Sequence, residues 1–347
     1  MPLKVALIGT GYMARKHADM LAGHPQANLA VVCSTGRSAS VAREFRDTYG
    51  FRHQTTDWEA IASDPSVDVV FVCSPDATHA DCTAGLLEAG KHVLCEKPLA
   101  TSEPDFDRLR RALARGGGVL QVGMNCRYRE QYERPQRLVA SSSLGRLRFV
   151  RGTYLYNSVE KVHKREKAWW FDHPKDTFFF LHGGGIHCID LLQWIGGPVR
   201  SVHARATGFE LGTDFKADTF SVSLEFESGI IGELLVSSSA FLPRDFTLEF
   251  WLSEGAIRGT TVYRREGDLV SESVEVLPVL QPLPDLHLQF DELVNAVRHG
   301  EPIMNCLDEA YENYCIIRAV ERSVRERRPI AVESPAGVGL TPGSAKG

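Results

Sequence analysis

The sequence lacks the usual marks of secreted, membrane-spanning and disulfide-bonded chains. No apolar run reaches the about 18 residues that a membrane helix needs. Met1–Lys4 leads straight into the apolar Val5–Ile8, without a charged leader. The eight cysteines include no C-x-x-C pair, so buried free thiols in a reducing compartment are favoured over disulfides or a zinc site. We expect a cytoplasmic protein without a metal.

Blocks of one charge sign are scarce as well. The 39 Lys and Arg and the 44 Asp and Glu are mixed along the chain and leave a net charge of −5. The basic cluster Lys161–Lys167 is interpreted as a solvated loop, whereas a nucleic-acid-binding face needs clustered basic side chains. We therefore expect no nucleic-acid partner, no membrane partner, and a small molecule as the ligand.

The first part of the chain alternates short apolar runs with amphipathic stretches. Strands buried on both faces and joined by crossover helices give this pattern, which predicts a doubly wound α/β Rossmann domain over residues 1–125. The predicted strands are Lys4–Gly9, Ala27–Ser34, Val67–Ser74, His92–Glu96 and Val119–Gly123. The predicted helices are Tyr12–Ala22, Ala39–Tyr49, Trp58–Ser63, His79–Ala89 and Glu103–Arg115.

The pattern changes after Tyr128, where strands and turns predominate. Phe220–Phe226 alternates with period two, as in a sheet with one open face. We predict an α+β domain with a large, open, mostly antiparallel sheet over residues 126–333, and a disordered tail at 334–347. Its predicted strands are Arg148–Tyr156, Val199–Thr207, Thr219–Phe226, Ile230–Ser238, Thr247–Ser253 and Ile257–Tyr263, and its helices Gly185–Ile195, Leu286–Gly300 and Leu307–Glu326.

A glycine-rich turn follows the first predicted strand and opens the first predicted helix. It reads GTGYMA over Gly9–Ala14, a G-x-G-x-x-A motif. Gly9 permits the tight turn, Gly11 lets the backbone approach a pyrophosphate, and the small Ala14 lets the helix pack on the sheet. Free amides and the positive end of the helix dipole favour phosphate there. The motif predicts dinucleotide binding; the alternative is a tight turn without a ligand.

The end of the second predicted strand bears on the choice of cofactor. Val31–Ser34 and the residues after it include no carboxylate to bind the ribose hydroxyls of NAD. Ser34, Arg37 and Ser38 instead offer hydroxyls and a guanidinium, which suit a 2′-phosphate. NADP is therefore predicted to be preferred over NAD. The alternative is that Arg37 lies over the adenine while either cofactor binds.

The stretch Val93–Leu99, with Glu96-Lys97-Pro98 after a strand, resembles the signature of the Gfo/Idh/MocA oxidoreductase family. Further matching segments are Val70–Pro75 with Thr78-His79, Gly123–Arg127, Gly185–Asp190 and Phe290–Gly300. The resemblance implies a Rossmann domain and an open-sheet domain whose outer face commonly forms homodimers or homotetramers. It also implies hydride exchange between a nicotinamide cofactor and a hydroxyl or keto group of a sugar, cyclitol or related compound.

The motifs, the resemblance and the departure from it described below together give the expected residues of the site. The expected catalytic residues are Lys97, His187 and His182. The expected cofactor-binding residues are Gly9, Gly11, Tyr12, Met13, Ser34, Arg37, Ser38, Ser74, Pro75, His79, Glu96, Lys97 and Asn125. The expected substrate-binding residues are Lys97, Arg127, Trp169, His182 and His187.

Lys97 and His187 make chemical sense as the proton-handling residues. Pro98 keeps Lys97 extended at the carboxyl end of a strand, where ligands bind in open α/β sheets. Its ammonium would bind a substrate oxygen, and Glu96 would orient Lys97 or hold the nicotinamide. A neutral His187 would take the hydroxyl proton as hydride leaves the same carbon, with Asp190 as a candidate to fix the ring. The alternatives are a surface Glu–Lys pair and a structural helix-start histidine.

The sequence departs from the family at one position. Family dehydrogenases typically carry an Asp four residues before the His, and here that residue is Gly183. His182 is the predicted substitute, with Asp172 or Asp176 as alternatives further away. A glycine run at 183–185 predicts close approach of the backbone to a ligand, or a wider pocket.

Three functions remain open on the sequence. The leading prediction is an NAD(P)-dependent dehydrogenase or reductase acting on a sugar, cyclitol, aminosugar or glycoside. The second is a glycosidase that uses NAD transiently. The third is a non-catalytic sensor of sugars or dinucleotides, which the missing Asp favours and the retained Lys97 and His187 oppose.

Overall fold

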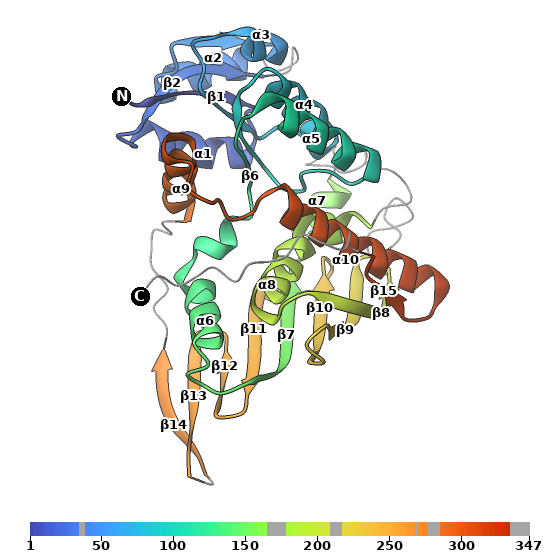
Figure 1. Cartoon of the computed structure of the whole chain (residues 1–347). Helices are drawn as coiled ribbons and strands as arrows, with labels where there is room; N and C mark the ends of the chain where they lie inside the picture. Colours follow the sequence, from blue (N-terminus) through green and yellow to red (C-terminus); the bar gives the residue numbers. More distant parts are fainter. Residues whose placement is uncertain (35–38, 165–177, 209–216, 268, 277–284, 334–347) are drawn as a thin grey trace.

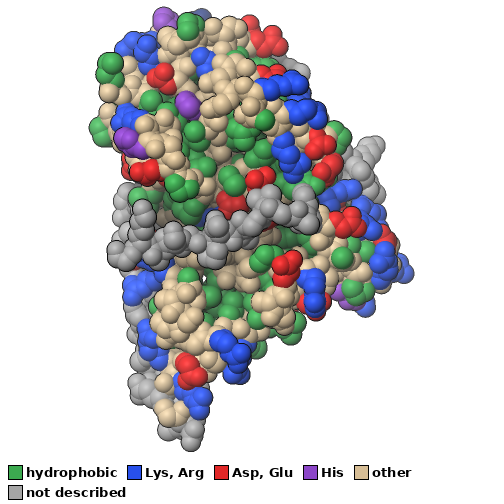
Figure 2. Space-filling view, in the orientation of Figure 1, with side chains coloured by type: hydrophobic (Ala, Val, Ile, Leu, Met, Phe, Trp, Pro, Cys, Tyr) green, Lys and Arg blue, Asp and Glu red, His purple; other side chains and the backbone are tan. Residues whose placement is uncertain are grey.

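The computed structural model describes residues 1–34, 39–164, 178–208, 217–267, 269–276 and 285–333. It contains two sheets, the first in the upper half of Figure 1 and the second in the lower half. Figure 2 shows positive and negative side chains interspersed over both halves on the face turned to the viewer.

The first sheet is the predicted Rossmann sheet. Its six strands are parallel and lie in the order β3-β2-β1-β4-β5-β6, so the chain changes direction across the sheet between β1 and β4. The strands are β1 (Leu3–Ile8), β2 (Ala27–Cys33), β3 (His53–Thr55), β4 (Val69–Val72), β5 (His92–Cys95) and β6 (Leu120–Val122). The helices are α1 (Tyr12–Ala22), α2 (Ala39–Tyr49), α3 (Trp58–Ser63), α4 (His79–Glu88) and α5 (Glu103–Gly116). The prediction of the doubly wound fold is confirmed.

Local chemistry sets the ends of the helices. In α5, the hydroxyl of Ser102 accepts from the amide of Asp105, Pro104 lies in the first turn, and Gly117 follows the helix with a φ of 67°. These are a side-chain N-cap, a proline where no amide partner is needed, and a left-handed C-terminal residue. Helix α1 differs, because its N-cap, Gly11, has no side-chain hydrogen bond.

The second sheet has nine strands in the order β14-β13-β12-β11-β7-β10-β9-β8-β15. Only β7 and β10 pair in parallel, and the other neighbours are antiparallel, as predicted. The strands are β7 (Leu147–Leu155), β8 (Val199–Thr207), β9 (Thr219–Phe226), β10 (Ile231–Ser237), β11 (Asp245–Leu252), β12 (Gly255–Arg258), β13 (Thr261–Glu266), β14 (Leu269–Val276) and β15 (Ile330–Ala331). The helices of this half are α6 (Glu130–Ala140), α7 (Val159–His163), α8 (Ile186–Gly196) and α10 (Leu307–Glu326).

One predicted strand of this sheet is wrong. Ile257–Tyr263 is not a single strand, because a turn with Gly259 at a φ of 56° separates β12 from β13. A positive φ suits glycine and reverses the chain. The sequence also does not predict the short edge strand β3, whose His-Gln-Thr composition is polar, or the helix α6.

The period-two alternation of β9 matches its burial. Phe220, Val222, Leu224 and Phe226 are buried, whereas Ser221 and Ser223 are exposed and Thr219 and Glu225 are partly buried. Helices α8 and α10 contact the sheet at β7 and β8. The sheet therefore buries its apolar face under these helices and leaves the other face exposed.

Helix α9 (Asp285–His299) joins the Rossmann half although it comes late in the chain. Its Phe290, Leu293 and Val294 lie in one apolar cluster with Val5 and Leu7 of β1. Figure 1 shows α9 beside α1. The domain limits 1–125 and 126–333 remain an expectation to which α9 is a spatial exception, and the tail 334–347 lies outside the described residues.

Candidate active site

A cleft of about 1600 Å³ opens at the carboxyl ends of the Rossmann strands. Loops after β1, β2, β4 and β5 line one side, and β7, α8 and the segment before β11 line the other. In doubly wound sheets ligands bind where the strand order reverses, which here is between β1 and β4. The cleft thus lies where the fold class places a dinucleotide.

The turn between β1 and α1 fits a dinucleotide phosphate. Gly9 has a φ of 113°, and a Cβ added to it would lie 2.3 Å from the carbonyl oxygen of Cys73. At Gly11 an added Cβ would meet no atom within 4 Å, so the cleft reaches the backbone there. Ala14 is fully buried against the sheet. The start of α1 therefore borders the cleft, and the free amides of a helix N-terminus favour phosphate there.

Most of the predicted cofactor residues line this cleft. They are Gly9, Gly11, Tyr12, Met13, Ser34, Ser74, Pro75, His79, Glu96, Lys97 and Asn125. Arg37, Ser38 and Trp169, together with the alternative acids Asp172 and Asp176, lie outside the described residues.

Glu96 is held by a histidine of the first helix. The Nε2 atom of His17 lies 2.9 Å from Oε1 of Glu96, and both side chains are buried. Burial opposes ionisation, but the hydrogen bond and charge of His17, with the charge of Lys97, hold the pKa of Glu96 below its usual value. Glu96 is therefore an anion fixed from the Rossmann side of the cleft.

His79 joins the two loops that carry Ser74 and Lys97. Its Nδ1 lies 2.8 Å from the carbonyl oxygen of Pro98, and its Nε2 lies 2.9 Å from that of Ser74. Burial lowers its pKa, but the nearby Cys95, Asp76 and the Pro98 carbonyl outweigh burial and raise the pKa of His79 to about 10. An imidazolium that donates to both carbonyls fixes the position of Lys97.

Lys97 contacts the second domain directly. Its Nζ donates to the carbonyl oxygen of Gly183 at 2.6 Å. Gly183 belongs to a π-helical turn, Leu181–Gly185, that leads into α8. Single π turns within helices occur frequently at functional sites.

His187 is the second residue of α8 and lines the same cleft. Burial, with the positive charges of Lys97, Arg129 and Arg244, holds the pKa of His187 well below its usual value. Its buried Nδ1 has no hydrogen-bond partner in the described part of the chain. The ring is therefore neutral at physiological pH and able to accept a proton.

The structure does not bring His182 to the cleft lining. Its side chain is 1% exposed, and its Nε2 lies 3.4 Å from Oε1 of Glu321 on α10. Burial opposes ionisation of Glu321, but His182, the amide of Phe178 and Arg318 hold the pKa of Glu321 below its usual value. His182 thus lies behind Gly183 rather than beside a substrate, so direct proton transfer by His182 is not supported by its position.

Arg127 also lies away from the cleft lining, against its expected contact with substrate. Its guanidinium is 2% exposed, donates to both carboxylate oxygens of Asp190 at 2.6 and 2.9 Å, and pairs with Glu309. Asn313 donates to the same Asp190 at 2.8 Å. Asp190 therefore ties α8 to α10 and the domain crossing, and does not fix the ring of His187.

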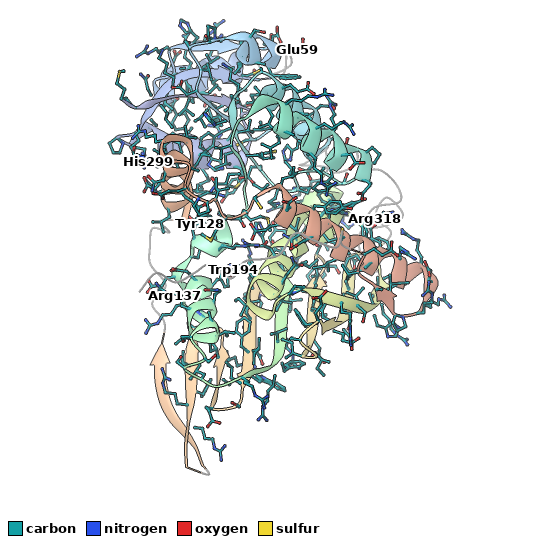
Figure 3. All side chains as sticks on the ribbon, viewed as in Figure 1. Glu59, Tyr128, Arg137, Trp194, His299 and Arg318 are labelled. Atoms are coloured by element: carbon teal, nitrogen blue, oxygen red, sulfur yellow. The ribbon has the colours of Figure 1, made fainter. Side chains whose placement is uncertain are left out.

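A second polar cluster holds the domain crossing together. Tyr128, labelled in Figure 3 where the two halves meet, donates to Glu292 of α9. Gln121 donates to the same carboxylate at 2.8 Å and to the Tyr128 hydroxyl at 2.9 Å. Trp194, also labelled, lies with its ring centre 5.4 Å from the guanidinium of Arg127.

The glycine run at 183–185 packs against the second sheet and also borders the cleft. A Cβ added at Gly184 would lie 2.6 Å from the ring of Tyr154, and one at Gly185 would lie 3.2 Å from Val236. Side chains of the sheet occupy the space beside Gly184 and Gly185. These glycines therefore do not provide the wider pocket that the sequence suggested as one alternative. Gly183 and Gly184 nevertheless line the cleft, so the predicted close approach of backbone to ligand stays open.

Several cleft residues carry no motif in the sequence. They are Arg129, Tyr154, Tyr156, Lys161, Arg244 and Asp285. Asp285 accepts from Asn125 at 2.8 Å and from Arg129 at 2.9 Å. These residues come from four separate segments, and the tertiary fold alone brings them together.

A Rossmann domain facing an open-sheet domain across one cleft is the architecture of a two-domain, nicotinamide-dependent oxidoreductase. The chain belongs to the Gfo/Idh/MocA oxidoreductase family. The profile of that family's NAD-binding Rossmann fold matches residues 3–124, and the profile of its C-terminal domain matches residues 132–258. The resemblance seen in the sequence is confirmed.

The chain is similar along its length to characterised enzymes. It is 26% identical to the myo-inositol 2-dehydrogenase of Thermotoga maritima, over 96% of this chain and 100% of that protein. It is 27% identical to the 4-carboxy-2-hydroxymuconate-6-semialdehyde dehydrogenase of a Sphingobium species, over 92% of this chain and 98% of that protein. The fold matches that of levoglucosan dehydrogenase in complex with NADH and L-sorbose, with a TM-score of 0.84 and 22% identity over 96% of this chain and 100% of that one.

Among the residues that the structure describes, no helix has both the length and the apolar character needed to cross a membrane.

Proposed function

We propose that this chain is a dehydrogenase or reductase that exchanges a hydride between NAD(P) and a hydroxyl or keto group of a sugar, cyclitol, aminosugar or glycoside. The observation that carries the proposal is the meeting of Lys97 and His187, from different domains, in one cleft with the open start of α1. The nicotinamide, when bound, supplies or accepts the hydride. The names of the two relatives include a cyclitol and a carboxylated aldehyde, so family membership leaves the substrate class open.

The residues of the cleft divide the work between them in this proposal. Gly9 and Gly11 hold the pyrophosphate, and the ammonium of Lys97 binds the reacting oxygen. His187, neutral because of its surroundings, takes the proton from the hydroxyl. His182 supports the turn that carries Gly183 and touches no reacting atom.

The test is a screen of polyols, cyclitols and aminosugars with NAD and NADP, followed by the absorbance of the reduced nicotinamide. Net reduction with at least one hydroxyl compound is expected. Glycoside cleavage without net reduction would instead identify a glycosidase that uses NAD transiently. Dinucleotide and sugar binding without any turnover would identify a sensor.

We further propose that NADP is the preferred cofactor. Ser34 is buried at the end of β2 and lines the cleft. A nearby carboxylate, Asp57, accepts from the amide of Glu59 as the N-cap of α3 and does not line the cleft. No carboxylate of the described cleft lining therefore repels a 2′-phosphate at the end of β2.

Calorimetric titration of both cofactors tests this preference. Ser34→Asp should reverse it, because a carboxylate repels the 2′-phosphate and binds ribose hydroxyls. Ser63→Asp, on the exposed side of α3, is the matched control and should leave the order unchanged. Tighter binding of NAD by the unaltered protein would refute the preference.

A further inference from the structure

We infer that the substrate of this cleft carries an anionic group, a carboxylate or a phosphate, which Arg244 binds beside the reacting hydroxyl. The inference deepens the proposed function and rests on it for the reaction, while the binding of the anion can be measured separately.

Cationic side chains from several segments line the cleft, and three of them act on His187. Lys97 follows β5, Arg129 follows the 3-10 turn Asn125–Tyr128, and Arg244 precedes β11. All three act on His187, since each lowers its pKa. Positive charge from three separate segments of the cleft lining therefore acts on the imidazole that would accept the proton.

Two of these three cations meet uncharged oxygens. Lys97 donates to the carbonyl of Gly183 at 2.6 Å. Arg244 donates to the hydroxyl of Tyr154 at 3.4 Å, and its guanidinium lies 5.4 Å from the centre of that ring. Arg129 is the exception, because Asp285 accepts from its Nε at 2.9 Å.

Each carboxylate of the described cleft lining either is already bound by side chains of the cleft or lies on the Rossmann side. Asp285 is bound by Arg129 and Asn125. The others belong to the Rossmann side: Asp19, Asp76, Asp81 and Glu96. Gly183, whose carbonyl meets Lys97, supplies no carboxylate of its own. In the described residues, no carboxylate raises the pKa of His187.

Arg244 is the side chain best suited to bind the anion. It is exposed, it lines the cleft, and its ring contact with Tyr154 holds the guanidinium at the wall. A guanidinium offers a planar fork of donors that matches a carboxylate or phosphate. An anionic substrate would neutralise the positive charge that a neutral sugar leaves unmatched.

Isothermal titration of the protein saturated with NADPH tests the inference, because the reduced cofactor prevents oxidation of an added alcohol. The ligands are glucuronate with glucose, galacturonate with galactose, and glucose 6-phosphate. We expect at least one acid to bind ~10-fold or more tightly than its neutral counterpart, as charge-assisted hydrogen bonds allow. The uronates and the phosphate ester tell the two anionic groups apart.

Arg244→Gln should weaken binding of the preferred acid by ~10- to 100-fold and leave the neutral sugar unchanged. Arg137→Gln is the matched control, because Arg137 lies on α6, is 60% exposed and pairs with Glu133 away from the cleft (Figure 3). Gly183→Asp places a carboxylate near Lys97 and should also weaken binding of the acid. Its added Cβ lies 3.3 Å from the ring of Phe179, so a small ring shift admits it.

Equal binding of acids and neutral sugars, or no binding of any acid, would overturn the inference. So would an Arg244→Gln variant that weakens both kinds of ligand equally, because the positive charge would then serve only the reacting oxygen. Binding of an acid with no net nicotinamide reduction in the substrate screen would keep the inference and refute the dehydrogenase. Oxidation of neutral polyols without binding of any acid would support the dehydrogenase and refute the inference.

Discussion

The ammonium of Lys97 and the carbonyl oxygen of Gly183 lie 2.6 Å apart, across the boundary between the two domains. Gly183 has no side chain, so a backbone carbonyl meets the ammonium here. A carbonyl accepts a hydrogen bond without a full negative charge. The positive charge of Lys97 is therefore less neutralised than it would be beside a carboxylate, and it is more available to a bound oxygen.

Replacement of this ammonium tests its role. Lys97→Ala should lower the rate by ~10²- to 10⁴-fold, the usual contribution of a proton-handling group. Dinucleotide binding and thermal unfolding should change little, since His17 holds Glu96 independently. Lys164→Ala, in the exposed pair with Glu160, is the control. Near-normal turnover of Lys97→Ala would remove this residue from the mechanism.

The pH dependence of the rate should report His187. A base acts only when it is unprotonated, and the surroundings hold the pKa of His187 below its usual value of about 6.5. The rate should therefore fall only at a pH below about 6.5. Arg244→Gln removes one positive charge, so the pKa of His187 should rise and the acid limb should move to higher pH. If the acid limb of the pH–rate profile persists unchanged in His187→Ala, the titrating group is not His187.

The buried pair of His182 and Glu321 leads to a different expectation. His182→Ala leaves Glu321 with one partner fewer and should lower the free energy of unfolding by ~1–3 kcal/mol. Combined with Glu321→Gln, the two losses should not add, because the residues share one contact. The acid limb of the rate should stay in His182→Ala. Non-additivity in rate between His182→Ala and His187→Ala would instead restore His182 to the proton relay.

Arg127 should matter for stability rather than for substrate binding. Arg127→Met leaves the buried Asp190 and the partly buried Glu309 without their cation, which should cost ~3–5 kcal/mol in denaturant unfolding. Arg108→Met breaks the exposed pair with Asp81 and should cost about 0–1 kcal/mol. A stable Arg127→Met protein with a raised KM would support the expected contact with substrate.

The exposed face of the second sheet should carry the homo-oligomer expected from the sequence. Trp251 and Ile231 are 45% and 59% exposed, and the register places both beside Phe149 of β7. The rings of Phe149 and Trp251 lie 4.4 Å apart. Light scattering should give a dimer or tetramer at micromolar concentration, and Trp251→Glu should dissociate it. Trp251→Phe is the conservative control, and a monomeric unaltered protein would contradict the assembly.

Local patterns in the sequence predict both halves of the fold and the dinucleotide turn. Runs such as Val69–Val72 are fully buried and apolar throughout, so a buried parallel strand can be predicted from this segment alone. The backbone at residue 9 has a positive φ, which favours glycine, so this part of the turn can be predicted from the sequence. Helix α10 matches its predicted bounds Leu307–Glu326, because its amphipathic period and its capping residue Glu309 act within one segment.

The sequence by itself determined the Rossmann fold, the phosphate-binding turn and the family of the chain, whose matching segments include Lys97 and His187. Only the tertiary structure decided what surrounds them. It buried Arg127 against Asp190, turned His182 toward Glu321, and brought Arg244 into the cleft. Strands, helices and turns follow from neighbours a few residues apart, which the sequence contains. The pairing of charges depends on residues many positions apart, and only the packed chain brings those together.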